Sequence, residues 1–321
     1  MSIEFQVAEM LKQVALDEGI KDYVLQHPSL YQPLLHAALR FIGGETLADC
    51  VETGELLNRQ GFAVTIDYMG ESTRDADMAQ QATEEFLRVI QAIAEQNLDS
   101  SVSLDLSHIG MVIDAELGYE NACTLAEAAR NKGLEMMISM EGTDRTSLIL
   151  EIYQRLCETF ENVGITLQAY LHRTPSDLEN ALQRPGKIRL VKGAYAAPAD
   201  LTKTRGAELD ESYRLLMERL LMSGHPCSIA THDPALLDPL PLEYAHKFLQ
   251  EKGIELNHIE FEMLKGVTQE RLEAMKNHGY RTRVYLPYGR EWHLYLCNRL
   301  AEYPPNIYQA IIDAAKYKYS R

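Results

Sequence analysis

Two segments of the chain carry charged residues at spacings that could support chemistry on a small molecule. In the first, RLVKGAY at 189–195, Arg189 and Lys192 stand four residues and one residue before Gly193. A pair of cations followed by a glycine, where backbone can approach a ligand closely, suits a phosphate or the polar rim of an isoalloxazine ring. The pattern is short, so by itself it predicts only a site for an anion or a polar ring.

The second segment is RVYLPYGREWHLYLCNRLAE, at 283–302. A strand is expected to end at Tyr285, and a Pro-Gly turn then leads into a helix. Tyr295, Arg299 and Glu302 fall close to one face of that helix by their spacing of three and four residues. A helix lying over a binding site and an ordinary outer helix both fit this pattern.

The elements that must position these residues alternate regularly after about residue 60. Short, often β-branched apolar runs alternate with longer amphipathic stretches, among them 76–96, 119–131, 145–160, 207–223, 242–252 and 268–277. The runs expected to be strands are AVTIDY from 63, SVSLDLS from 101, LEMMIS from 134, GITLQAY from 164, KIRLVKG from 187, PCSIATH from 226, HIEFEML from 258 and YRTRVYL from 280.

Eight strand-helix units predict an α/β fold, a closed (β/α)8 barrel of the TIM type. An open doubly wound sheet is the alternative, but the GxGxxG turn that usually follows its first strand is missing. Before the barrel, the pattern is helical and broken by prolines and by a pair of glycines. We therefore predict an N-terminal helical arm over 1–60 and a catalytic barrel over 61–321.

Polar residues gather at the predicted carboxyl ends of the strands, the edge where parallel barrels carry their reactive groups. Each of them alone could be a solvated loop residue, but their shared placement predicts one polar mouth. They are Asp67, Glu71, Asp105, Ser107, Ser139, Glu141, Gln168, Arg189, Lys192, Thr231, His232, Glu262 and Tyr285.

Composition excludes several classes of protein. The net charge of −16 and the pI near 5.1 disfavour nucleic acid as a partner. Five scattered cysteines without CxxC spacing argue against a disulfide framework and fit a reducing cytoplasm. The N-terminus is not of the signal-peptide type and no apolar run could span a bilayer, so we expect no stable membrane insertion, while peripheral membrane contact stays open.

A metal site is not expected, because no HxH pair precedes His232 and the other histidines lack a ligand pattern. A metal-dependent hydrolase using His232 with Asp105 or Glu262 is nevertheless an alternative from another enzyme class. A third interpretation is a catalytically inactive protein of this fold that serves as a binding protein.

The chain resembles the proline dehydrogenase family, including the corresponding domain of bifunctional proline utilisation proteins. The resemblance spans roughly 63–310 and rests on TIDYMGE, LQAYLHRT, RLVKGAY and YLPYGREW...YLCNRLAE. It implies a distorted barrel that holds FAD noncovalently, with the last helix above the flavin at the barrel mouth. It also implies a hydride transfer from a carbon next to an amine nitrogen to flavin N5, which turns L-proline into 1-pyrroline-5-carboxylate.

The resemblance also implies roles for individual residues and for a partner. Arg189, Tyr285 and Tyr195 would be catalytic, and the electron acceptor would commonly be a membrane quinone. The residues expected to hold FAD are Gln168, Arg189, Val191, Lys192, Gly193, Thr231, His232 and Glu302, and those expected to contact substrate are Asp105, Ser139, Ala194, Leu264, Asn298 and Arg299.

Three pocket positions depart from the family pattern. Asp105 stands where the family has lysine, Ser139 where it has aspartate, and Asn298 where it has the first arginine of a carboxylate clamp. With Arg299 counted, the formal charge of these four positions falls from +2 to zero. Either a Lys-Asp pair was simply exchanged and Arg299 still binds a carboxylate, or the substrate is a more cationic or carboxylate-masked amine.

Overall fold

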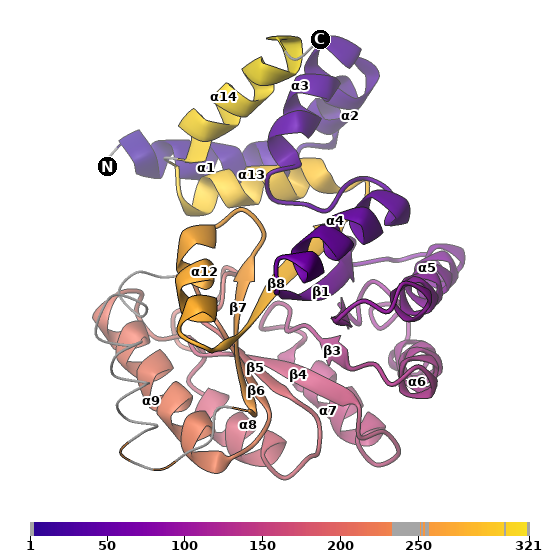
Figure 1. Cartoon of the computed structure of the whole chain (residues 1–321), viewed down its shortest axis with the longest axis vertical. Helices are drawn as coiled ribbons and strands as arrows, with labels where there is room; N and C mark the ends of the chain where they lie inside the picture. The colour runs from indigo at the N-terminus through magenta and orange to yellow at the C-terminus, as the bar shows by residue number, and fades with distance from the viewer. Residues whose placement is uncertain (1–2, 233–250, 252, 254–256, 305, 320–321) are drawn as a thin grey trace. The chain divides into compact units, whose positions relative to one another are not determined.

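Eight parallel strands close into a barrel in chain order, as predicted (Figure 1). The computed structural model describes residues 3–232, 251, 253, 257–304 and 306–319. The strands are β1 (Ala63–Tyr68), β2 (Ser100–Leu104), β3 (Met136–Ile138), β4 (Val163–Gln168), β5 (Ile188–Val191), β6 (Cys227–Ala230), β7 (Ile259–Leu264) and β8 (Arg281–Tyr288). All eight runs expected to be strands are therefore confirmed.

Helices follow most strands and cover the outside of the barrel (Figure 1). They are α5 (Ala76–Glu95), α6 (Ala115–Asn131), α7 (Thr146–Leu156), α8 (Thr174–Ala181), α9 (Ala207–Ser223) and α12 (Gln269–Asn277). The sequence reading did not specify α8. The helix predicted over 242–252 lies outside the described residues, apart from Glu251.

Helix α5 illustrates why these segments are helical. The Asp75 carboxylate accepts the Met78 backbone N–H at 3.0 Å and so caps the first turn. Phe86, Ile90 and Ile93, three or four residues apart, are fully or almost fully buried. A capped start and an apolar stripe of this period place the helix with one face on the barrel.

The chain forms two compact units, one made of Met1–Thr53 with Leu286–Arg321 and the other of Gly54–Tyr285. The helices outside the barrel are α1 (Ile3–Ala15), α2 (Glu18–Gln26), α3 (Pro28–Ala38), α4 (Leu47–Arg59), α13 (Trp292–Glu302) and α14 (Asn306–Tyr319). The predicted division of the chain into a helical arm over 1–60 and a barrel over 61–321 stays a prediction.

Within the unit that contains both chain ends, α1 packs against α13 and α14 packs against α3. Arg40 forms an ion pair with Asp313 of α14 at 2.6 Å. The helix that carries Asn298 and Arg299 was expected to be the last one, which is wrong, because α14 follows it. None of the described helices is long and apolar enough to cross a bilayer.

Candidate active site

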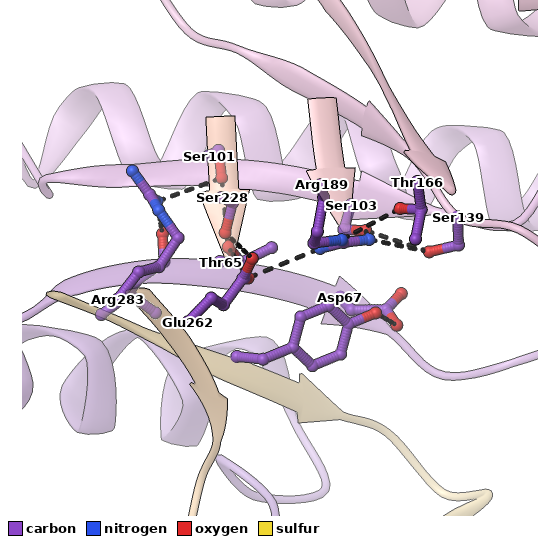
Figure 2. A network of polar contacts seen from close by, with 12 residues as sticks. Thr65, Asp67, Ser101, Ser103, Ser139, Thr166, Arg189, Ser228, Glu262 and Arg283 are labelled. Atoms are coloured by element: carbon purple, nitrogen blue, oxygen red, sulfur yellow. Dashed lines mark hydrogen bonds and ion pairs between the residues drawn. The ribbon is translucent and has the colours of Figure 1, made fainter. Parts of the chain in front are cut away.

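Arg189 lies at the centre of a polar network inside the barrel (Figure 2). Its Nε donates to Thr166 Oγ1 at 2.9 Å, and its Nη2 donates to Ser103 Oγ at 2.9 Å and Ser139 Oγ at 3.2 Å. Side chains alternate along a strand, so the buried Ile188 and Leu190 flank an arginine that points to the opposite face of the sheet. Because β5 and β2 are not neighbours in the barrel, the bond to Ser103 must cross its interior.

Glu262 of β7 balances the charge of this arginine. Its Oε1 lies 3.5 Å from Arg189 Nη1 and accepts a hydrogen bond from Thr65 at 2.7 Å, while Ser228 donates to Oε2 at 2.8 Å. The two charged side chains are only 4% and 3% exposed. A buried charge is tolerated when it is paired and hydrogen-bonded, so the network fixes one cation in a defined position.

Tyr285 and Asp67 adjoin the arginine. The Arg189 guanidinium lies 5.1 Å from the centre of the Tyr285 ring, and the Tyr285 hydroxyl donates to Asp67 Oδ2 at 2.5 Å. Burial raises the pKa of Asp67 to about 6, against the opposing effects of the Tyr285 hydrogen bond and the Arg189 charge. At neutral pH this carboxylate is therefore ionised in surroundings that disfavour its charge.

Further carboxylates lie around Asp67 at the ends of β1 to β3. Burial raises the pKa of Asp105 well above its ordinary value, and the neighbouring acidic groups raise it further. A hydrogen bond from Ser139 has the opposite effect and lowers this pKa. The pKa of Glu71 is also raised, by burial and by the charge of Glu141. The carboxyl ends of these strands therefore gather acidic side chains that disfavour one another's charged forms.

The loop after β5 approaches β4 closely at Gly193. The Gly193 φ is +102°, and a Cβ there would lie 2.2 Å from a ring carbon of Tyr170 and 3.0 Å from Gln168 Oε1. Gln168 donates its Nε2 to the Glu141 carbonyl at 2.8 Å. Its buried Oε1 has no hydrogen-bond partner among the described residues, so an acceptor is left available next to Gly193.

The remaining residues predicted for the barrel are more dispersed. Lys192 forms an ion pair with Asp210 of α9 at 2.5 Å. Tyr195 is 37% exposed, and burial of its hydroxyl and the nearby carboxylates raise its pKa. The other predicted residues of the barrel are Val191 at the end of β5, the exposed Ala194, the buried Thr231 and half-buried His232 after β6, and Leu264, which is paired in register with Tyr285.

Asn298, Arg299 and Glu302 belong to α13, in the other compact unit. Within that helix, Arg299 forms an ion pair with Glu302 at 2.5 Å. The network of Figure 2 is thus built from residues of Gly54–Tyr285, whereas the predicted clamp residues belong to the unit of Met1–Thr53 and Leu286–Arg321.

Sequence reasoning missed four hydroxyl residues that complete the network, namely Thr65, Ser103, Thr166 and Ser228. Three of them stand two positions before a predicted mouth residue, as Ser103 does before Asp105. Because strand side chains repeat every two residues, that spacing was the available signal. In the part of the chain that the structure describes, no three His, Cys, Asp or Glu residues are grouped to hold a metal ion.

A closed parallel barrel with a fixed cation and carboxylates of raised pKa at the strand ends has the form of a TIM-barrel enzyme site. The chain belongs to the proline dehydrogenase family, whose profile, described as Proline dehydrogenase, matches residues 50–306. Members of this family are flavin-dependent dehydrogenases that act on a CH–NH group.

Individual relatives agree with this assignment. Proline dehydrogenase 2 of Bacillus subtilis is 36% identical over 271 residues, which cover 84% of this chain and 88% of the relative. Proline dehydrogenase of Deinococcus radiodurans is 32% identical over 280 residues, or 86% and 89% of the two chains. The crystal structure of proline utilization A from Bdellovibrio bacteriovorus matches 96% of this chain and 40% of its own with a TM-score of 0.75 at 18% identity, which supports the fold.

The chemistry of the site fits a flavin. The unpartnered Gln168 Oε1 can accept a hydrogen bond from a ring N–H, and Gly193 leaves no room for a side chain beside it. Arg189 places a positive charge on the same side of the barrel, and four of its five N–H donors are used within the described residues. A cation held in this way stabilises a ring that becomes anionic on reduction.

Proposed function

We propose that this chain is an FAD-dependent dehydrogenase of the proline dehydrogenase type, which oxidises L-proline or a related cyclic secondary amine to an imine. Bound FAD supplies the hydride acceptor for the carbon next to the amine nitrogen. The observation that carries the proposal is the buried Arg189, held in one orientation by Thr166, Ser103, Ser139 and Glu262 in a chain of this family.

The proposed roles follow from what each side chain can do. Arg189 provides a fixed positive charge next to the ring, and Tyr285 presents a ring face whose orientation is set by its bond to Asp67. Tyr195 is proposed as the third catalytic residue, beside Arg189 and Tyr285. Gln168, Arg189, Val191, Lys192, Gly193, Thr231, His232 and Glu302 are proposed to hold FAD.

Asp105, Ser139, Ala194, Leu264, Asn298 and Arg299 are proposed to contact the substrate. For α13 this requires a position over the barrel mouth, which the family resemblance supports. The resemblance alone also supports transfer of electrons to a membrane quinone by a cytoplasmic protein in peripheral contact with the membrane. Reoxidation of the substrate-reduced enzyme by a soluble quinone analogue, compared with molecular oxygen, tests that acceptor.

The central test is spectroscopic. The purified protein is expected to carry flavin, and anaerobic mixing with a cyclic secondary amine is expected to bleach its absorbance. Arg189→Met should slow bleaching at least about 100-fold, the usual effect of losing one preorganised electrostatic group. Arg219→Met is the control, because Arg219 is 45% exposed and pairs with Glu179 on the outer helices. A protein without flavin, or a flavin that no amine reduces, would contradict the proposal.

A further inference from the structure

Glu141, in the loop after β3, forms hydrogen bonds with three neighbouring parts of the barrel. Its Oε1 accepts the Ser107 backbone N–H at 3.0 Å, and its Oε2 accepts Arg145 Nη1 at 2.7 Å. Its backbone carbonyl accepts Gln168 Nε2 at 2.8 Å. The residue is 1% exposed, so these bonds, in place of solvent, fix the position of its carbonyl.

The carbonyl of Glu141 in turn sets the direction of the Gln168 side chain. A carbonyl can only accept a hydrogen bond, so the amide of Gln168 must turn its NH2 group toward Glu141. Its Oε1 then faces Gly193, where a Cβ would lie 3.0 Å away, and this oxygen has no partner among the described residues. A rotated amide would place a donor there, which could not accept a bond from a ring N–H.

Arg145 links Glu141 to the loop after β1. Its Nη2 donates to Ser72 Oγ at 3.0 Å, and the Ser72 backbone N–H donates to Ser107 Oγ at 2.9 Å. Ser72 has a φ of +57°, which a residue other than glycine adopts only when its surroundings hold it there. One network therefore joins the loops after β1, β2 and β3, and the guanidinium of Arg145 supplies two of its bonds.

The stability of its own helix does not explain the position of Arg145. This residue is the N-cap of α7, but its side chain forms no capping hydrogen bond. A cation at a helix N-terminus also faces the positive end of the helix dipole, which is unfavourable. Arg145 Nε lies 3.6 Å from the exposed Asp144, whereas the shorter contacts of the guanidinium go to Glu141 and Ser72. These two bonds account for an arginine at this position.

We propose that Arg145 is a positioning residue for the flavin. Through Glu141 it holds the Gln168 amide in one orientation, so that Oε1 accepts a hydrogen bond from a ring N–H of bound FAD. The inference rests on the proposed function, because it requires FAD to occupy the site beside Gly193. Arginine suits this role because different nitrogens of its planar group serve Glu141 and Ser72, which a single ammonium cannot do in the same geometry.

The test is a double-mutant cycle on the FAD-loaded protein, in which the release of FAD on dilution is followed by flavin fluorescence. Arg145→Met and Gln168→Leu should each raise the FAD dissociation constant about tenfold, the effect of losing one hydrogen bond to the ring. Because both changes remove the same bond, the double variant should bind FAD about as weakly as Gln168→Leu alone. A dissociation constant about 100-fold above the parent value would mean that the two effects are independent, and would overturn the inference.

The absorption spectrum of bound FAD gives a second readout, which a purely structural role of Arg145 would not change. The absorption bands respond to hydrogen bonds at the ring, so Arg145→Met and Gln168→Leu should shift them in the same direction. Arg155→Met is the matched control, because Arg155 lies on the same helix, is 36% exposed and pairs with the exposed Glu116 of α6 at 2.8 Å. It should leave the dissociation constant and the spectrum unchanged. An unshifted spectrum in Arg145→Met, or an equal shift in Arg155→Met, would overturn the inference.

The outcomes separate this inference from the proposed function. A parent protein that binds no FAD would contradict the proposed function, whereas FAD binding that Arg145→Met leaves unchanged would overturn the inference alone. Arg145→Lys keeps a positive charge beside Glu141, so it replaces the methionine variant in the same cycle if that variant fails to fold. Additive effects of Arg145→Lys and Gln168→Leu would again overturn the inference.

Discussion

Replacement of Asp67 by asparagine is expected to stabilise the protein at neutral pH while it impairs activity. Burial raises the pKa of this carboxyl group from 3.8 to about 6. The folded state therefore holds the proton more tightly than the unfolded chain, and it is penalised once Asp67 ionises. A shift of roughly two units at about 1.4 kcal/mol per unit gives a penalty of about 3 kcal/mol at pH 7.

The sign determines the pH window. For a carboxyl group whose folded pKa is raised, stability is lost as the pH rises from about 4 to about 6, and the full penalty is present above that range. Asparagine is neutral throughout and its side-chain oxygen can still accept the hydrogen bond from Tyr285. The Asp67→Asn variant should therefore be more stable than the parent protein by up to about 3 kcal/mol at pH 7, and nearly equal to it at pH 4.

Urea unfolding at pH 4 and pH 7, followed by circular dichroism at matched flavin content, measures this difference. The exposed Asp99→Asn variant is the control and should change the free energy of unfolding by no more than about 0.5 kcal/mol at either pH. The reasoning is refuted if Asp67→Asn is less stable than the parent at pH 7, or if its effect is the same at both pH values.

Two further variants test other parts of the barrel. Gly193→Ala should lower the flavin-to-protein absorbance ratio and the melting temperature, because its Cβ would meet Tyr170 at 2.2 Å, whereas Gly206→Ala, at a similar φ of +101° but with no atom within 4 Å, should keep its flavin. Equal flavin loss in both variants would contradict this. Arg283→Leu should cost about 3–5 kcal/mol in urea unfolding, because it removes a buried partner of Glu260, and the 52% exposed Arg281→Ala about 0–1 kcal/mol. Similar costs for the two arginines would argue against a buried ion pair.

The sequence predicted the barrel because its strands carry a local signal. In AVTIDY, Val64 and Ile66 alternate with Thr65 and Asp67, and such two-residue periods recur between capped helices of ordinary length. The turn glycines and the family motifs agree with this alternation of strands and helices along the chain. The helical spacing of Ile307, Ala310 and Ile311 also indicates the terminal helix α14, which was not predicted because it lies beyond the last family motif.

The site was predicted only in part. Arg189, Ser139, Tyr285 and Asp105 were all expected near one another, and the hydrogen bonds and electrostatic contacts of the structure join them. Glu262 was recognised as a mouth residue, but its pairing with Arg189 was not. Those two residues are 73 positions apart in the sequence, and no local pattern links them.

The sequence by itself determined the chemical types of RLVKGAY and the unusual charge at Asp105, because residue identity does not depend on folding. Only the tertiary structure decided which charges neutralise one another. Closure of the barrel brings β5 and β7 to face a common interior, so Arg189 meets Glu262, while Lys192 meets Asp210 of α9. Pairing requires side chains to converge in space, which depends on barrel closure and strand register and cannot be read from residue types alone.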